Sequence, residues 1–128
     1  RAHRVRVIPA ADEVLRGWKF VARRIGVEPV ANVRAVEAAL DHARALSTGH
    51  TDEAAALFYA FACRPRALVG GGRYVPILMV INEVRRAGLE LQATRDDVEA
   101  LRKTLLTADR PSFDEVRAWF AARLVHRT

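Results

Sequence analysis

Residues Ala54–Cys63 read AAALFYAFAC, a stretch that is apolar on every side of a helix. A helix that is hydrophobic all round is expected in the middle of a domain. Thr51 is predicted to cap this helix, and Asp52 and Glu53 fall in its first turn, where the helix dipole favours carboxylates. The stretch therefore predicts a buried central helix, around which the rest of the fold is arranged.

A second apolar run, Val75–Ile81, predicts another central helix over Arg73–Ala87, in which Pro76 is tolerated because it falls in the first turn. Gly88 is expected to stop it. Four further helices are predicted from apolar residues that recur every three or four positions, at Asp12–Ile25, Asn32–Leu46, Thr94–Leu105 and Ser112–Leu124. The expected fold class is all-α, one compact domain over residues 1–128 with about six helices around two buried central ones.

Two short segments favour extended structure. Val5–Ile8 is β-branched and ends at Pro9, which is typical of an edge strand or an extended arm, so residues 1–9 are expected to precede the helical body. Leu89–Leu91 is also short and extended. One pairing open to it is with Val5–Ile8, which would form a minor two-stranded sheet.

The balance of charges is basic: 21 Lys and Arg residues stand against 15 Asp and Glu residues, a formal net charge of +6. Such a field favours an acidic partner, such as a phosphorylated ligand, a nucleic acid or an acidic protein. Nucleic acid is the less favoured of these, because no aromatic residues interleave with the arginines as a stacking platform requires.

The cysteine content and the lengths of the apolar runs indicate the cellular compartment in which the protein is expected. Cys63 is the single cysteine, so an internal disulfide is excluded and a reducing environment is expected. The longest apolar runs are too short to cross a bilayer, and no signal peptide is visible. The sequence therefore predicts a cytoplasmic protein that does not contact a membrane.

Three glycines and a cation stand directly before the second central helix. Free backbone N–H groups at a helix start, the positive end of the helix dipole and the lack of side chains together favour an anion. Arg73 adds a charged fork to this arrangement. The alternative interpretation is a plain flexible turn with a solvated arginine. The predicted phosphate- or nucleotide-binding residues are Gly70, Gly71, Gly72, Arg73, Arg64 and Arg66.

Three stretches carry a family pattern: GVEPVANVRAVEAALDHARA at Gly26–Ala45, EAAALFYAFA at Glu53–Ala62, and Val75–Leu91, whose apolar helix continues into RRAGLEL. With the order of the helices, the chain resembles the Fic/Doc (Fido) family, most closely its death-on-curing branch. The resemblance implies an all-helical protein that transfers part of a nucleotide to a hydroxyl of another protein. Fic proteins commonly attach AMP, and death-on-curing toxins are kinases that a partner antitoxin blocks.

The active-site motif of that family, H-x-F-x-[DE]-G-N-x-R, is eroded here. Its histidine is the general base, its carboxylate holds magnesium, and its glycine, asparagine and arginine bind phosphate. When Arg73 is matched to the motif arginine, Gly70 falls on the glycine, but Pro65 stands at the histidine and Val69 at the acid. Matching Pro65 instead to the proline that often follows the histidine puts Arg64 at the histidine position. Neither placement supplies a base or a magnesium ligand.

His50 is the nearest histidine along the chain and is the candidate base of a rebuilt site. We expect a degenerate Fic/Doc-like domain that lacks transferase activity and binds a nucleotide, another phosphorylated ligand or a protein partner such as an antitoxin. No metal ligand is assigned. One alternative is an active AMP- or phospho-transferase toxin, which would need magnesium and ATP. The other is a basic nucleic-acid-binding module.

Overall fold

A computed structural model describes residues 8–49, 52–69, 80–82 and 84–126. Its central element is helix α3, Glu53–Ala62, in which every residue but Tyr59 is buried. This confirms the central position that its all-round hydrophobicity predicts. The residue that precedes the helix is Asp52, whereas the predicted cap, Thr51, lies outside the described residues.

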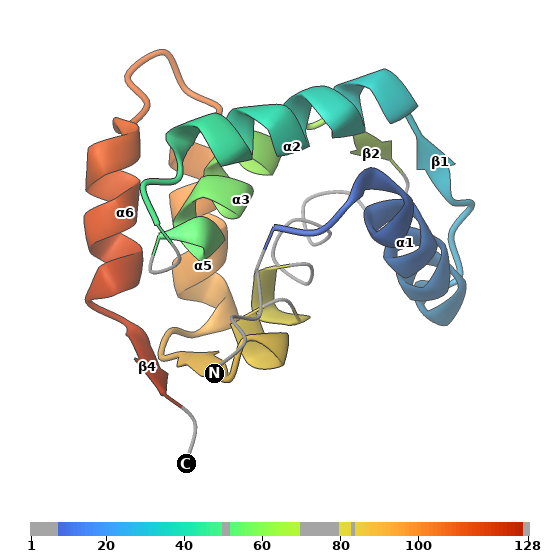
Figure 1. The fold of residues 1–128 in the computed structure, drawn as a ribbon. Helices are drawn as coiled ribbons and strands as arrows, with labels where there is room; N and C mark the ends of the chain where they lie inside the picture. The colour runs from blue at the N-terminus through green and yellow to red at the C-terminus, as the bar shows by residue number, and fades with distance from the viewer. Residues whose placement is uncertain (1–7, 50–51, 70–79, 83, 127–128) are drawn as a thin grey trace.

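Two helices precede α3 in the chain, and both follow the predicted boundaries. Helix α1, Ala11–Ile25, buries Val14, Trp18 and Ala22, and ends at Gly26 with φ 77°, a left-handed conformation that glycine adopts without strain. Helix α2, Val33–Leu46, begins where the side chain of Asn32 accepts a hydrogen bond from the backbone N–H of Ala35. Figure 1 shows α2 extending from α6 on one side of the molecule to α1 on the other.

The carboxyl-terminal half adds two capped helices. In helix α5, Arg95–Thr104, the cap is Thr94, and in helix α6, Phe113–Ala121, it is Ser112. Each cap side chain accepts from the third backbone N–H of its helix, as the sequence predicts. The ring of Phe120 on α6 packs on that of Phe58 on α3, with centroids 5.4 Å apart.

Only part of the second predicted central helix can be described. Residues 80–82 and 84–86 are helical, and the side chains of Val80 and Val84 are buried in the core. Gly88 follows with φ 79°, so it ends this helix as predicted. Residues 70–79, which include Pro76, lie outside the described part of the chain.

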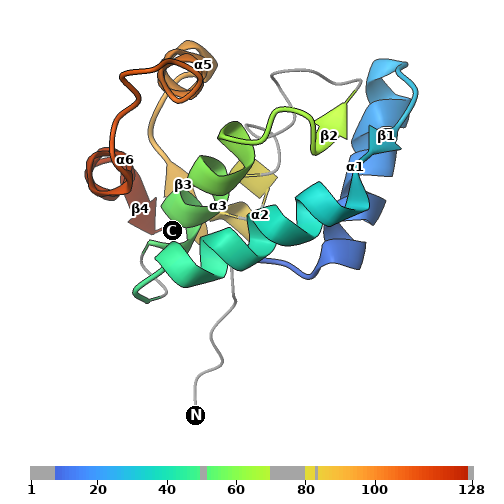
Figure 2. The ribbon, with the colours of Figure 1, turned by 90° about the horizontal axis from the view of Figure 1, so that it is seen from above.

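Two small antiparallel sheets accompany the helices. Strand β1, Val30–Ala31, pairs with β2, Leu68–Val69, although the sequence analysis had no strand at either place. Strand β3, Leu89–Leu91, pairs with β4, Leu124–His126, in the register Glu90 to Val125. Figure 2 shows β3 and β4 together, beside α6.

The second sheet corrects one prediction and leaves another untested. Leu124 was expected in the last helix, but α6 ends at Ala121 and the chain turns there into β4. Leu89–Leu91 is extended as predicted, and its partner among the described residues is the carboxyl-terminal strand. Of the suggested partner Val5–Ile8, only Ile8 is described, and it forms a bend with its side chain buried in the core.

The architecture is thus mainly helical, built around a buried α3, as the sequence predicts. Within the described ranges, each helix is too short or too polar to span a lipid bilayer.

Candidate functional site

The residues predicted to bind phosphate are only partly described. Gly70, Gly71, Gly72 and Arg73 lie outside the described ranges, as does His50, so their roles stay predictions. Arg66 is exposed in the turn after α3. Arg64 is half-buried, and its Nη1 donates to the carbonyl oxygen of Ala60 at 3.0 Å. The same guanidinium nitrogen contacts a histidine that the sequence analysis did not assign.

That histidine is His42 on α2. Its Nδ1 lies 2.9 Å from Arg64 Nη1, and its ring meets that of Tyr59 edge to face, with centroids 6.0 Å apart. Because a guanidinium only donates, Nδ1 accepts, and the neutral ring carries its proton on Nε2. Burial lowers the pKa of His42, and the positive charge of Arg64 lowers it further. The lone pair of Nδ1 is thereby engaged, which leaves His42 unsuited to act as a general base through that atom.

Cys63 directly precedes Arg64 in the chain and lies at the end of α3. It is half-buried, and Arg110 Nη1 donates to its sulfur at 3.1 Å. The sequence places Cys63 in the apolar core, whereas the structure leaves the thiol partly accessible under a guanidinium. Nothing in the chain order indicated this contact, since the two residues are far apart in sequence.

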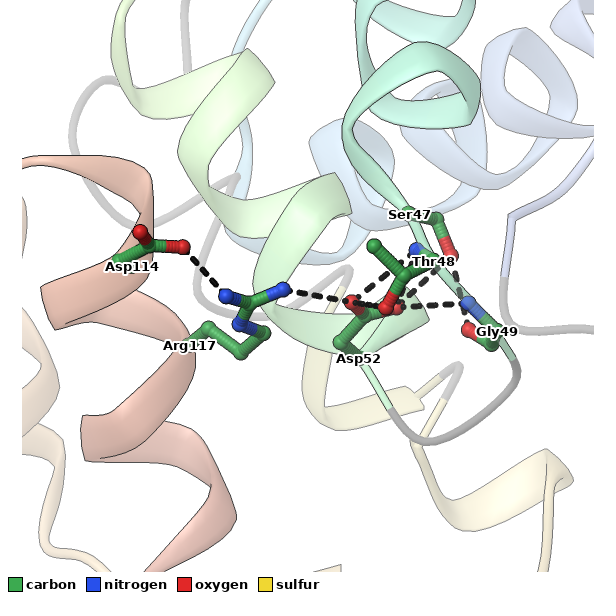
Figure 3. Close-up of polar contacts among 6 residues, drawn as sticks. All are labelled: Ser47, Thr48, Gly49, Asp52, Asp114 and Arg117. Atoms are coloured by element: carbon green, nitrogen blue, oxygen red, sulfur yellow. Dashed lines mark hydrogen bonds and ion pairs between the residues drawn. The ribbon is translucent and has the colours of Figure 1, made fainter.

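Asp52 organises the loop that leads into α3, as Figure 3 shows. Its carboxylate accepts from the hydroxyl of Thr48 at 2.7 Å, from that of Ser47 at 2.9 Å and from the backbone N–H of Gly49 at 3.3 Å. Burial alone would raise the pKa of Asp52, but these hydrogen bonds, foremost those from Thr48, outweigh it and hold the pKa below its usual value.

This arrangement revises the predicted role of Asp52. The carboxylate makes no capping hydrogen bond to α3 and is instead turned back onto the loop at residues 47–49. Arg117 on α6 adds an ion pair, with Nη1 3.6 Å from Asp52 Oδ2, and it also pairs with Asp114. The Asp52 cluster thereby links α3, α6 and the loop at residues 47–49.

A cavity of about 430 Å³ lies between α1 and the helical residues 80–82 and 84–86. Such a volume falls in the range of small-molecule sites, which is roughly 300–1,000 Å³. Apolar and polar groups both line it. The described residues at its wall are Pro9, Glu13, Val14, Gly17, Val21, Asn82, Arg85 and Arg86.

The charged groups at the cavity differ in whether they already have hydrogen-bond or ion-pair partners. Glu13 already has two partners: its carboxylate accepts a hydrogen bond from the backbone N–H of Ala10 at 3.1 Å and lies 3.8 Å from Arg86 Nη2. Arg85 is exposed and makes no ion pair or hydrogen bond with the described residues. Within the described part of the chain, the cavity therefore presents the guanidinium of Arg85 without a partner, an amide from Asn82 and an apolar wall from Val14 and Val21.

Gly17 gives the cavity part of its width. A Cβ built on Gly17 would meet no atom within 4 Å, and the backbone there is ordinary helix. Sequence analysis placed Gly17 inside the first helix without assigning it a role. Glycine inside a helix lowers the stability of the helix. The glycine within the first predicted helix was therefore the signal in the sequence that could have pointed to the cavity.

Comparison of the chain with protein-family models, curated proteins and solved structures found no match. Among the residues that the structure describes, no three His, Cys, Asp or Glu side chains come together as a metal ion would require.

Proposed function

We propose that this protein is a binding domain for a small phosphorylated ligand of the nucleotide class, held in the cavity between α1 and residues 80–82 and 84–86. The observation that carries the proposal is a cavity of about 430 Å³ that combines an apolar wall with a guanidinium left without a partner in the described chain. Pockets that bind small molecules are mostly apolar, with a few polar groups that fix orientation.

The chemistry of the wall favours a ligand with two unlike parts. Val14, Val21 and Pro9 suit an apolar or planar body, and the amide of Asn82 offers both a donor and an acceptor to it. Arg85 suits an anionic group, because a guanidinium binds phosphate oxygens in pairs. A base or sugar attached to phosphate combines these two parts, and the net charge of +6 adds a general attraction for such an anion.

Binding without group transfer is the form of the proposal that the described residues favour. Among the described residues of the cavity wall, the carboxylate is that of Glu13, and it already contacts the start of α1 and Arg86. A guanidinium donates hydrogen bonds and accepts none, so Arg85 and Arg86 are suited to position an anion and not to act as a general base. The proposal includes the degenerate Fic/Doc-like domain that the sequence resembles, with a cytoplasmic location and an antitoxin as protein partner.

A thermal-shift titration tests the proposal. The domain is titrated with ATP, GTP, CTP and UTP, with and without magnesium, because a ligand that binds only the folded state raises the melting temperature. We expect at least one nucleotide to raise it, and Arg85→Ala to remove most of the shift. The matched control is Arg34→Ala, which removes an exposed arginine of α2 away from the cavity.

Two further variants locate the site. Gly17→Leu should fill the cavity and abolish the shift, whereas Gly17→Ala adds a single methyl group and should retain it. Arg73→Ala tests the glycine-rich segment at residues 70–73 separately. A shift that survives Arg85→Ala and Gly17→Leu but is lost in Arg73→Ala would reject the cavity and favour that segment. The absence of a shift with every nucleotide would reject nucleotide binding altogether.

A further inference from the structure

Among the helices that the structure describes, α1 has the most basic outward face. Residues 14–27 contain Arg16, Lys19, Arg23 and Arg24 and include no Asp or Glu. Positions three and four residues apart are neighbours on a helix surface, so these cations surround Phe20 on one face. The opposite face, with Val14, Trp18 and Ala22, is buried in the core.

Arg16 pairs with Asp12 on its own helix, but the other three cations of this face differ from the paired arginines of the other helices. Arg44, Arg102 and Arg117 each form an ion pair with a carboxylate three residues away on their own helix. Lys19, Arg23 and Arg24 have no carboxylate partner within the described ranges. Their charge is therefore available to a second molecule.

An exposed aromatic residue lies at the centre of this charge. Phe20 is 62% exposed, the largest value among the exposed large hydrophobic side chains, and the guanidinium of Arg24 lies 5.6 Å from the centre of its ring. Burial of an exposed phenylalanine side chain against a partner would be favourable, because it removes apolar surface from water. Aromatic residues and arginine are also the types enriched at protein interfaces and among residues that dominate binding energy.

We propose that the α1 face formed by Lys19, Phe20, Arg23 and Arg24 docks an acidic segment of a partner protein. Carboxylates of the partner would pair with the three cations around an apolar pocket that receives Phe20. This inference is independent of the cavity, since none of the four residues lines it.

The composition of the face favours a protein over the other polyanions. Nucleic acid and anionic lipid would be satisfied by the cations alone. One side of the Phe20 ring is already covered by Arg24, which leaves it poorly placed to stack between bases. A membrane would need the apolar stripe of α1, but Val14 and Trp18 are buried in the core.

Fluorescence anisotropy with the intact domain tests this proposal. The probe is a labelled peptide of about 16 residues, a length at which isolated helices begin to form, with Leu at helical spacing and Glu elsewhere. The comparison probes are the same peptide with Gln for every Glu, a single-stranded oligothymidylate, and vesicles of phosphatidylserine and phosphatidylcholine. We expect the Glu peptide to bind most tightly and its affinity to fall as salt is raised.

Variants assign the binding to this face. Phe20→Ala and the double variant Arg23→Glu/Arg24→Glu should each lower the affinity for the Glu peptide by about tenfold or more. Arg34→Glu/Lys103→Glu changes the net charge equally at exposed positions elsewhere and should leave the affinity within about twofold. Circular dichroism confirms that each variant is folded, which is expected because all five positions are exposed.

Several results would overturn the proposal. These are the absence of binding by the Glu peptide, equal binding by the Gln peptide, tighter binding by the oligothymidylate or the vesicles, and full affinity in the Phe20 variant. An equal loss in the Arg34/Lys103 control would show that net charge alone attracts the peptide.

Discussion

Arg117 on α6 directs its guanidinium at the buried carboxylate of Asp52 at the start of α3, with Nη1 3.6 Å from Oδ2. Asp52 is 4% exposed and also accepts hydrogen bonds from Ser47, Thr48 and Gly49. One carboxylate thus joins a loop and two helices that are distant in sequence. Such a buried charge stabilises the fold only while all of its partners are present.

Replacing Asp52 should therefore be costly. Asp52→Ala leaves the N–H groups of Thr48 and Gly49 without their acceptor, and we expect the free energy of unfolding to fall by about 2–4 kcal/mol. Urea denaturation followed by circular dichroism measures it. Asp114→Ala is the control, because it removes the exposed partner of Arg117 and should cost less than about 1 kcal/mol. A similar loss in both variants would contradict the assigned role of Asp52.

Acid should weaken the same contact. Hydrogen bonds hold the pKa of Asp52 below its usual value in the folded state, so the unfolded chain binds the proton first. The stability that Asp52 contributes is complete above its unfolded pKa of about 3.9 and is lost as the pH falls through the folded value. Denaturation between about pH 6 and pH 2 should show a smaller decline in Asp52→Asn than in the wild type. An equal decline would place the acid sensitivity at other carboxyl groups.

Protonation of His42 should lower the stability of the fold at a higher pH than protonation of Asp52 does. Burial and the charge of Arg64 lower its pKa, so protonation favours the unfolded chain. Stability is complete above the unfolded pKa of about 6.5 and should decrease as the pH falls through the lower folded value. Comparing urea midpoints at about pH 7.5 and pH 5 checks this. His42→Gln retains an acceptor for Arg64 and cannot titrate, so most of the difference should vanish; a full difference in that variant would exclude His42.

Gly17→Ala should stabilise the protein. The new Cβ meets no atom within 4 Å, and alanine is the better residue in a helix interior, so we expect a gain of about 0.5–1 kcal/mol. A calorimetric melting temperature above that of the wild type would report the gain. Gly26→Ala is the matched contrast, because φ is 77° there and the same substitution should lower the melting temperature. If both variants shifted in the same direction, helix propensity would not explain the result.

Trp18→Phe should loosen the contact of α1 with β1. The indole N–H of Trp18 donates to the carbonyl oxygen of Val30 at 3.0 Å, and the side chain is 1% exposed. Phenylalanine leaves that carbonyl without its donor and creates a void, at an expected cost of about 2–4 kcal/mol in urea denaturation. Trp119→Phe replaces a half-buried indole that stacks on Arg123 and should cost less. A larger cost at Trp119 would contradict the assignment.

The candidate sites show where sequence-based prediction stops. The basic charge and the all-round apolar Ala54–Ala62 were readable from composition and periodicity. The cavity was not, because it joins Gly17 and Val21 to Asn82 and Arg85, which lie about half the chain further on. The pairing of Arg64 with His42 was missed for the same reason, since neither residue has a local pattern that names the other.

Local sequence patterns were enough to predict the ends of α1 and α2, the caps at Asn32, Thr94 and Ser112, and the buried position of α3. These depend on periodicity, capping side chains and glycine, all of which act within a few residues. Tertiary packing selects the pairing of Leu89–Leu91 with Leu124–His126, the ion pair of Asp52 with Arg117, and the cavity beside α1. These contacts join distant residues, and their choice depends on which buried surfaces and hydrogen-bond partners the packed helices bring together.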